Sequence, residues 1–146
     1  MDNQPVIELL SYRISNIRLQ HFNELNEVNN LDPKIGDISA NIGVSEDKEI
    51  AQIELSTSVA ARSKNNDIQR AISMTVVGQF KINEKINHID YLRVNGTAIL
   101  FPYLRTFISV VSSLDNEDAI VIPTVNTNNF TSESEWWNFI GTKRFL

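Results

Sequence analysis

Two histidines and one short acidic cluster are the residues of this sequence best suited to metal or acid–base chemistry. His21 and His88 lie far apart, and neither has the close spacing to a second ligand that zinc sites use. Asp115, Glu117 and Asp118 are near neighbours but lack the spacing of a calcium-binding loop. The chain has no cysteine, which excludes thiolate ligands. We therefore expect no metal site, and we interpret both histidines as structural or solvated side chains.

Phosphate-binding and nucleophile motifs are also missing from the sequence. There is no glycine-rich phosphate loop, and the pair Asn95-Gly96 indicates a turn rather than a nucleotide site. No serine lies in the pattern of a nucleophile elbow. These observations predict that the protein is not an enzyme and that it uses no cofactor.

The composition predicts one globular domain over residues 1–146, with 42% hydrophobic and 21% charged residues. A net charge of −5 and scattered basic residues argue against nucleic-acid binding, which requires clustered positive charge. The N-terminus lacks the pattern of a secretory signal, and no apolar run approaches the roughly 18 residues that span a bilayer. We expect a cytoplasmic protein without membrane insertion, which also suits the absence of cysteine.

Alternation of apolar and polar residues predicts most of the secondary structure. Three segments, 38–44, 51–59 and 72–82, alternate with period two and are predicted to be strands. Segment 11–19 also alternates, with one slip in parity that a β-bulge would absorb. We favour a strand there. A helix also fits the spacing, through Val6, Leu9, Leu10, Ile14 and Ile17.

The period changes after Asn83, and the apolar residues from Leu100 to Leu114 have the three- and four-residue spacing of an amphipathic helix. Pro102 must lie in its first turn or mark a kink, because proline donates no backbone hydrogen bond. The aromatic segment 135–140 fits one or two further helical turns. Strands followed by a helix predict an α+β fold, in which the helix covers one face of an antiparallel sheet.

Four short motifs resemble the SecB protein-export chaperones and their SecB-like relatives. The most specific is 100–105, Leu-Phe-Pro-Tyr-Leu-Arg, which is similar to the family's Leu-Phe-Pro-Tyr-x-Arg helix opening. Segment 123–126, Pro-Thr-Val-Asn, resembles the family's Pro-Val-Asn motif with one residue inserted. Segment 78–82 resembles its Gly-x-Phe-x-Ile strand end, and 12–19 lies where the family has its first strand. The motifs occur in family order and together span most of the chain.

The resemblance implies a two-layer fold, with a four-stranded antiparallel sheet packed against a long helix in the C-terminal half. It also implies an ATP-independent holdase that binds unfolded polypeptides, acts in protein export and assembles as a homotetramer, a dimer of dimers. One helix cannot cover both faces of a sheet, so we expect the uncovered face to be apolar and to be buried by self-association. Large apolar patches on proteins of this kind mark interaction sites.

The resemblance also implies a client-binding groove between the second strand and the C-terminal helix. The matching positions are Ile38, Ile42, Val44, Trp136, Trp137, Phe139 and Ile140. The strand residues have ordinary core packing as an equal alternative, and the two tryptophans could instead pack the tail. Because adjacent helical residues point about 100° apart, one tryptophan can pack while the other stays exposed. We expect at least one of them to contact clients, since tryptophan is favoured at binding hot spots.

Two departures from the family pattern concern the SecA motor. SecB proteins carry acidic contacts for SecA on the first strand, where this sequence has Asn16 and Gln20, and it ends without their acidic tail. The motor contact therefore does not carry over. The alternative is a SecB-like interaction module dedicated to one protein partner, such as a toxin–antitoxin client, without an export role.

Overall fold

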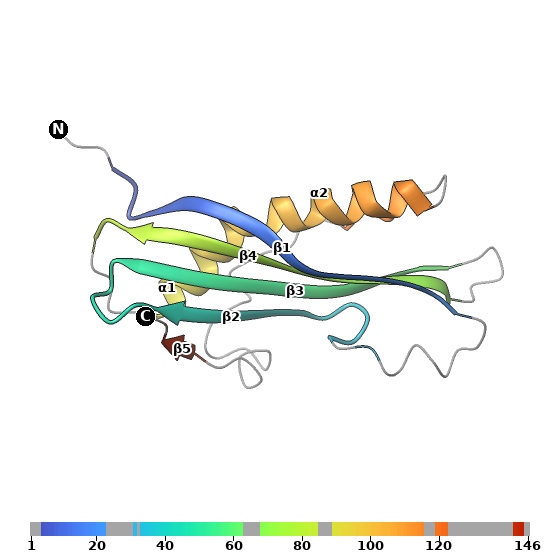
Figure 1. The fold of residues 1–146 in the computed structure, drawn as a ribbon, viewed down its shortest axis with the longest axis horizontal. Coiled ribbons are helices and arrows are strands. Elements are labelled where there is room, and N and C mark those ends of the chain that lie inside the picture. The colour runs from blue at the N-terminus through green and yellow to red at the C-terminus, as the bar shows by residue number, and fades with distance from the viewer. Residues whose placement is uncertain are drawn as a thin grey trace.

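In a computed structural model, the chain forms four long strands followed by one long helical segment (Figure 1). The structure describes residues 4–22, 31, 33–62, 68–84, 89–115, 119–122 and 142–144. The strands are β1 (Ile7–His21), β2 (Ile38–Val44), β3 (Ile50–Arg62) and β4 (Ile68–Ile82). The helical segment consists of α1 (Ile89–Tyr91), the π-helical turn η2 (Leu92–Gly96) and α2 (Thr97–Asp115), and a short strand β5 (Thr142–Arg144) follows.

The four long strands form an antiparallel sheet in the order β1-β4-β3-β2, which confirms the predicted four-stranded sheet. β1 pairs with β4 along its whole length, with register shifts between Leu9 and Ser11 and between Ile14 and Asn16. The second shift is the bulge predicted from the parity slip, and it returns Ile17 to the face that Ile14 occupies. The alternative helix in this segment is wrong, because the segment is extended and pairs with β4 from Ile7 to His21.

A fifth strand lies beside β2, although the sequence had suggested only helix in the tail. β5 pairs with β2 in the parallel direction, joining Ile42 to Thr142 and Val44 to Arg144. Figure 1 shows it as a short arrow at the edge of the sheet. The aromatic segment 135–140 lies outside the described residues, so its predicted helical turns stay a prediction.

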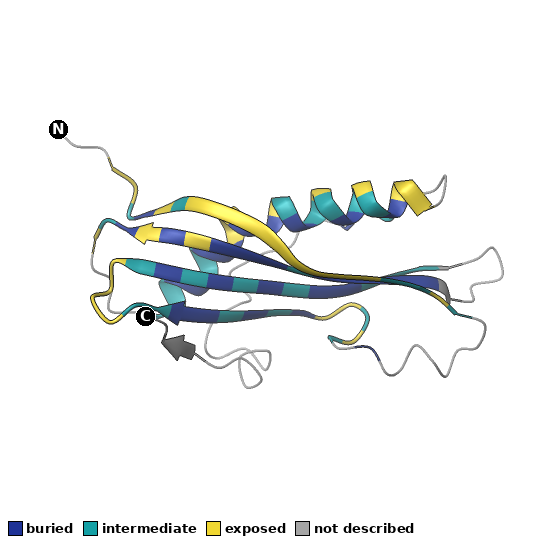
Figure 2. Cartoon of the chain, in the orientation of Figure 1, coloured by how far each residue is buried: buried dark blue, intermediate teal, exposed yellow. Residues whose placement is uncertain are grey.

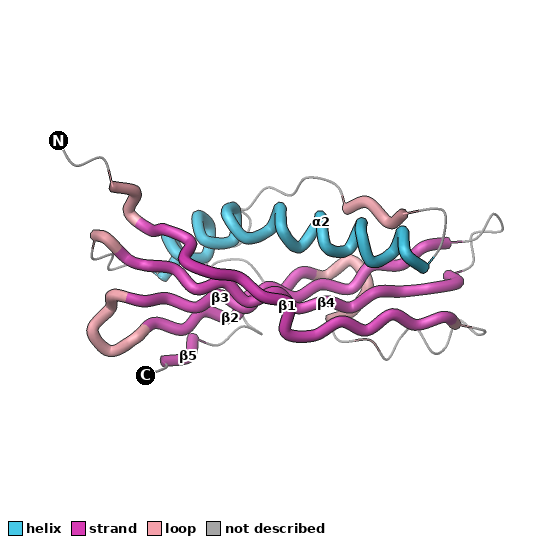
Figure 3. Tube along the Cα trace, turned by 45° about the horizontal axis from the view of Figure 1, so that its top comes forward, coloured by secondary structure: helices cyan, strands magenta, loops and turns pink. Residues whose placement is uncertain are grey.

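The helix lies on one face of the sheet, so the described fold has the predicted two layers (Figure 3). Figure 1 shows that the helical segment first crosses the strands and then runs along them. Pro102 is the sixth residue of α2 and follows α1 and η2, so it does not lie in the first turn. Pro102 and Ala98 are both exposed, so the Ala98 carbonyl that proline leaves without a helical donor can bind water.

Apolar side chains from the helix and from β2, β3 and β4 form the core. The fully buried ones include Phe80, Ile42, Ile53, Leu55, Ile72, Met74, Leu100, Leu104 and Ile108. Helix and sheet approach closely at Gly78 of β4, where an added Cβ atom would lie 2.9 Å from Cδ1 of Leu100. Gly78 therefore marks the close backbone approach that a glycine inside a strand indicates.

The face of the sheet opposite the helix is polar, which corrects the expectation of a bare apolar face. Its central positions on β3 and β4 carry Ser56, Ser58, Ser73 and Thr75, paired in the sheet register. Ser56 bonds to Thr75 through their hydroxyls at 2.8 Å, and Ser58 bonds to Ser73 in the same way at 2.7 Å. Such a face needs no apolar cover, because its side chains satisfy one another or bind water.

One end of this polar face is covered by the chain between β1 and β2. Leu31 is buried there against Ala71 of β4, with Phe22, Ile35 and Ala60 packed around them. Gly36 adopts a positive φ of 88° in the turn that leads into β2, and its amide donates to the Ser58 carbonyl at 2.9 Å. The turn therefore fixes where β2 begins, in a backbone conformation that favours glycine.

Candidate polypeptide-binding surface

Strand β1 is the edge of the sheet that extends beyond the helix, and it exposes large apolar side chains. Tyr12, Ile14 and Ile17 lie opposite Gly78, Val76 and Met74 of β4, which places all three on the helix side of the sheet. Their exposed fractions are 45%, 37% and 43%. In Figure 2 most of β1 is exposed while the neighbouring strands are largely buried. Apolar residues therefore lie on the helix side of β1, and this subunit covers them only in part.

The helix α2 carries a second apolar stripe beside the one that packs in the core. The stripe consists of Ile99, Tyr103, Phe107, Val110 and Leu114, which are spaced three or four residues apart. Val110 is 51% exposed and Leu114 is 82% exposed. At about 100° per residue, this stripe lies beside the buried stripe through Leu100 and Leu104. The helix is thus apolar over more of its circumference than the sheet can cover.

Aromatic contacts join the exposed residues of β1 to the second stripe of the helix. The rings of Tyr12 and Tyr103 stack with their centroids 4.2 Å apart, and the Phe107 ring lies 5.9 Å from Tyr12. We call the combined surface the apolar flank, defined by Tyr12, Ile14, Ile17, Ile99, Tyr103, Phe107, Val110 and Leu114. Tyr103 and Phe107 are half-buried against the core, whereas the other six residues are exposed. Large exposed apolar patches are common at interaction sites, so the flank is a candidate for one.

The apolar character of the helix is also relevant to the expectation that the chain has no segment able to span a membrane. The helical segment Ile89–Asp115 has 27 residues and is long and apolar enough, by length and composition alone, to cross a membrane. The expectation that no apolar stretch approaches this length is therefore wrong. Leu100, Leu104 and Ile108 are nevertheless fully buried against the sheet, which accounts for one side of the helix. The apolar residues of the helix that are not buried in this way include those of the apolar flank.

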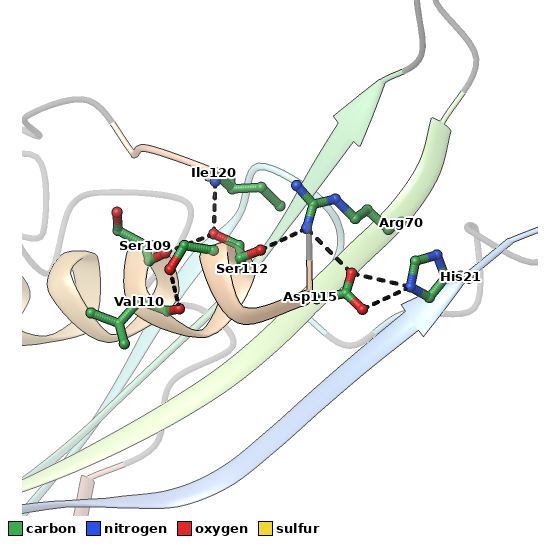
Figure 4. Close-up of polar contacts among 8 residues, drawn as sticks. His21, Arg70, Ser109, Val110, Ser112, Asp115 and Ile120 are labelled. Atoms are coloured by element: carbon green, nitrogen blue, oxygen red, sulfur yellow. Dashed lines mark hydrogen bonds and ion pairs between the residues drawn. The ribbon is translucent and has the colours of Figure 1, made fainter. Parts of the chain in front are cut away.

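A polar cluster holds the end of α2 on the sheet beside the flank (Figure 4). Arg70 of β4 is almost fully buried and donates from Nη1 to the Ser112 carbonyl at 2.9 Å. The same Nη1 lies 3.3 Å from the Asp115 carboxylate, and His21 Nε2 of β1 lies 3.1 Å from it. Ser112 Oγ accepts a hydrogen bond from the Ile120 amide at 2.7 Å. Three elements and the following segment therefore meet at the helix end.

The charges of this cluster favour the ionised form of Asp115. The hydrogen bond with His21 and the nearby Arg70 guanidinium hold the pKa of the Asp115 carboxyl below its ordinary value of 3.8, although partial burial opposes them. His21 therefore has a structural partner, as expected. His88, Glu117 and Asp118 lie outside the described residues. Within the described ranges, no three His, Asp or Glu side chains gather in a way that could hold a metal ion.

The β2 residues of the predicted client groove lie apart from the apolar flank, because β4 and β3 separate β2 from β1 in the sheet. Ile38 and Ile42 of β2 are buried in the core between sheet and helix, and Val44 is partly buried against it. Trp136, Trp137, Phe139 and Ile140 lie outside the described residues, so the predicted groove stays a prediction. Sequence reasoning did not single out the flank. Its only sequence signal was the excess of apolar residues between Leu100 and Leu114.

The architecture just described is that of the SecB-like chaperones. The chain is similar in structure to the SecB-like chaperone Rv1957 of Mycobacterium tuberculosis, whose structure is of a complex with a ChAD peptide from the Rv1956 HigA1 antitoxin. Its TM-score is 0.62 at 8% sequence identity, and the match covers 82% of this chain and 90% of the mycobacterial chain. Because the sequence identity is so low, the similarity establishes the SecB-like fold and nothing beyond the fold.

A second solved structure has the same architecture. It is a protein of unknown function from Streptococcus agalactiae, with a TM-score of 0.57 and 14% identity. The match covers 81% of this chain and 97% of the streptococcal one. No family model matches the sequence, and no curated protein is similar to it. Among these comparisons, the SecB-like fold is therefore supported by structural similarity.

Proposed function

We propose that this protein is an ATP-independent chaperone that holds non-native polypeptide segments against exposed apolar surface. The observation that supports this most is the apolar flank, which one subunit leaves open on both β1 and α2. The mycobacterial neighbour with the same fold was solved with a peptide from an antitoxin, which also favours a polypeptide ligand. Holding requires no catalytic residue, so the protein acts without being an enzyme.

The flank suits ligands of varied sequence because burial of apolar surface has no direction. Each Å² of apolar surface removed from water contributes about 25 cal/mol before the costs of ordering are subtracted. Tyr12 and Tyr103 add polar hydroxyls to apolar rings, a combination common at binding surfaces. An unfolded segment with a few large apolar side chains therefore gains affinity there without a matching sequence.

Self-association is the second use that we propose for this surface. A long exposed apolar edge is rare on proteins that remain monomeric, and a second copy offers a surface of matching character. We propose a homotetramer, a dimer of dimers, that buries part of the flank and leaves the rest to clients. The same proposal includes a cytoplasmic location. It also includes the predicted client-binding groove along β2 and the tail.

A dedicated role is the alternative to a general holdase, and one observation favours it. The positions of the SecA contacts are Asn16, which is exposed on the polar face, and Gln20, which is partly buried. Neither supplies negative charge, so a role in export through SecA lacks its electrostatic contact. A chaperone for one partner, as in a toxin–antitoxin system, does not need that contact.

Aggregation assays distinguish a general holdase from a chaperone dedicated to one partner. We expect the protein to suppress aggregation of several unrelated unfolded clients without ATP. Val110→Asp should abolish this, because it places a charge in the flank, whereas Ser113→Asp should not, because Ser113 is exposed one turn away outside the flank. Holding of a single client would favour the dedicated role. A monomer that holds no client would overturn the chaperone proposal.

The groove needs a separate test because none of its predicted residues belongs to the flank. Replacement of both Trp136 and Trp137 by alanine should weaken client binding while the circular dichroism spectrum stays unchanged. If folding and client binding both persist at the wild-type level, the tryptophans are not part of the client site.

A further inference from the structure

The polar face of the sheet carries two arginines at its β1 edge. Arg13 lies opposite Val77 of β4, and Arg18 lies opposite Ser73, which places both arginines on the face away from the helix. Both residues are exposed. Among the described residues, neither arginine forms an ion pair with a carboxylate. The edge therefore presents two positive charges that the described part of the chain does not neutralise.

Gln20, the next residue on the same face, holds Arg18 along the strand. In the amide orientation that satisfies both side chains, the Gln20 oxygen accepts hydrogen bonds from Arg18 Nη2 at 2.8 Å and from Nε at 3.2 Å. The other edge of the guanidinium, formed by Nη1 and Nη2, has the geometry that binds a carboxylate through two hydrogen bonds. Because the side chain is already ordered, it loses less conformational freedom when a ligand binds.

A row of neutral polar side chains lies between the two arginines. Asn16 of β1 lies opposite Thr75 of β4, which in turn lies opposite Ser56 of β3. Asn16 is exposed, and the half-buried hydroxyls of Thr75 and Ser56 bond to each other at 2.8 Å. A hydroxyl can donate one hydrogen bond and accept two, so such a pair retains one donor and further acceptors. This row can therefore bond to the backbone of a chain whose charged side chains contact the arginines.

The acidic residues of this face lie away from the two arginines. Glu8 lies opposite Lys81 at the start of β1, so opposite charges are neighbours there. Glu54 of β3 lies beyond Val77, two strands or about 10 Å from Arg13. The whole chain has a net charge of −5. The β1 edge is thus locally positive on an acidic protein, and local charge of this kind selects partners of opposite sign.

We infer that the polar side of β1 from Arg13 to Arg18 binds an acidic, extended segment of a partner protein, with one carboxylate on each guanidinium. The inference is separate from the chaperone proposal, since neither arginine belongs to the apolar flank. Val77 and Ser73, which lie opposite the arginines, are four residues apart, so the two arginines are about 13 Å apart along the strand. The same distance separates residues i and i+4 of an extended ligand. The ligand therefore has Asp or Glu at positions four residues apart.

The charge distribution favours a peptide over a nucleic acid as the ligand. Nucleic acids carry a phosphate at every nucleotide, and their binding uses many clustered Lys and Arg residues. This edge offers two arginines, and the net charge of −5 repels a long polyanion. Two planar guanidinium groups at a fixed spacing match two carboxylates at the same spacing.

The first test varies the ligand and uses the full-length wild-type protein. The probe is a fluorescein-labelled peptide that repeats Glu-Ser-Thr-Ser three times, so its glutamates are four residues apart, and its Kd is measured by fluorescence anisotropy. One control peptide has the same composition with its glutamates adjacent, and another has glutamine in place of glutamate. We expect the probe to bind at least about fivefold more tightly than the adjacent-glutamate peptide, and the glutamine peptide not to bind. The Kd of the probe should rise with salt concentration.

The second test varies the protein. Arg13→Glu/Arg18→Glu should raise the Kd of the probe at least about tenfold, because it replaces both attractive contacts by repulsive ones. The matched control is Lys48→Glu/Lys81→Glu, which changes the net charge equally at exposed positions outside the site. Its Kd should stay within about a factor of two of the wild-type value. Circular dichroism verifies that both variants are folded.

Each result decides for or against the inference. A preference for the spaced glutamates that is lost in the arginine variant and retained in the lysine variant supports it. An equal Kd for the spaced and adjacent peptides overturns it, and so does an equal Kd for the two double variants. Tighter binding of a twelve-nucleotide oligothymidylate than of the probe also overturns it, because the surface then prefers nucleic acid. The comparison of peptides needs no variant, so it decides the question even if the arginine variant fails to fold.

Discussion

Ile53 of β3 lies directly beneath Gly96, the last residue of the π-helical turn, and a Cβ atom on Gly96 would overlap its Cδ1 atom. Ile53 is fully buried in the core, so it has little freedom to move aside. The pair sets how closely the start of α2 approaches the sheet. The orientation of the helix, and with it the apolar flank, depends on this contact.

Gly96→Ala should lower the free energy of unfolding by about 1–3 kcal/mol, because the new methyl group overpacks the contact. Ile53→Val alone should cost about 0.5–1.5 kcal/mol, because it leaves a small cavity where Cδ1 was. The double variant should be more stable than the sum of the two predicts, since valine lacks the overlapping atom. Urea unfolding of the four proteins measures this coupling, and additive effects would contradict the proposed contact.

Thr97 and Thr57 form a matched pair for testing buried hydroxyl groups. Thr97 Oγ1 is buried and has no hydrogen-bond partner among the described residues, whereas Thr57 Oγ1 donates to the Asp37 carbonyl at 2.7 Å. Thr97→Val should raise the free energy of unfolding by up to about 1 kcal/mol, because it removes an unsatisfied polar group. Thr57→Val should lower it by about 1 kcal/mol. A loss of stability in both variants would show that Thr97 has a partner.

Asp115 should make the stability depend on pH in the acid range. Its pKa in the folded protein lies below the ordinary value of 3.8, because His21 and Arg70 stabilise the carboxylate. This contribution is fully present above the ordinary pKa and is lost as the pH falls from that value to the lowered one. Asp115→Asn should therefore destabilise the protein at neutral pH and flatten the acid limb of its stability profile. Thermal unfolding across the acid range measures the profile, and an unchanged slope would contradict the ion pairs.

Ile17 and Asn16 allow the same charge to be placed on opposite faces of one strand. Both are exposed on β1, but Ile17 lies on the helix side within the apolar flank and Asn16 lies on the polar side. Ile17→Asp should raise the Kd of self-association at least about tenfold, because it places an unpaired charge in an apolar interface. Asn16→Asp should leave the Kd within about a factor of two, because its side of the strand is polar. Light scattering over a dilution series gives both values. Equal behaviour of the two variants would exclude the flank as the oligomer interface.

The predictable part of the fold followed from periodicity. Period two in 38–44, 51–59 and 72–82 predicted β2, β3 and β4, and the parity slip near Ile14 predicted a bulge in β1. These signals are local, because a sheet with one buried face imposes its alternation on every strand. The motif at residues 100–105 led to the SecB-like fold, which the structural comparison confirms.

The location of exposed apolar surface was beyond the reach of periodicity. The sequence shows that the helix has many apolar residues, but not which of its sides the sheet covers. That depends on where the helix lies: it packs over β4 and β3, so Tyr103 and Phe107 extend toward β1. The expectation that the uncovered sheet face is apolar was wrong. That face carries Ser56, Ser58, Ser73 and Thr75, whose hydroxyl groups bond to one another in pairs.

By itself the sequence determined the kinds of secondary-structure elements and their order. It also showed which metal, phosphate-binding and nucleophile motifs are missing. These features depend on residue type and on local spacing. Tertiary structure decided which apolar residues stay exposed, which strands become edges and that β5 pairs with β2. Exposure and edge pairing depend on contacts between residues far apart in the chain. Local spacing carries no information about such contacts, so only the packed fold reveals them.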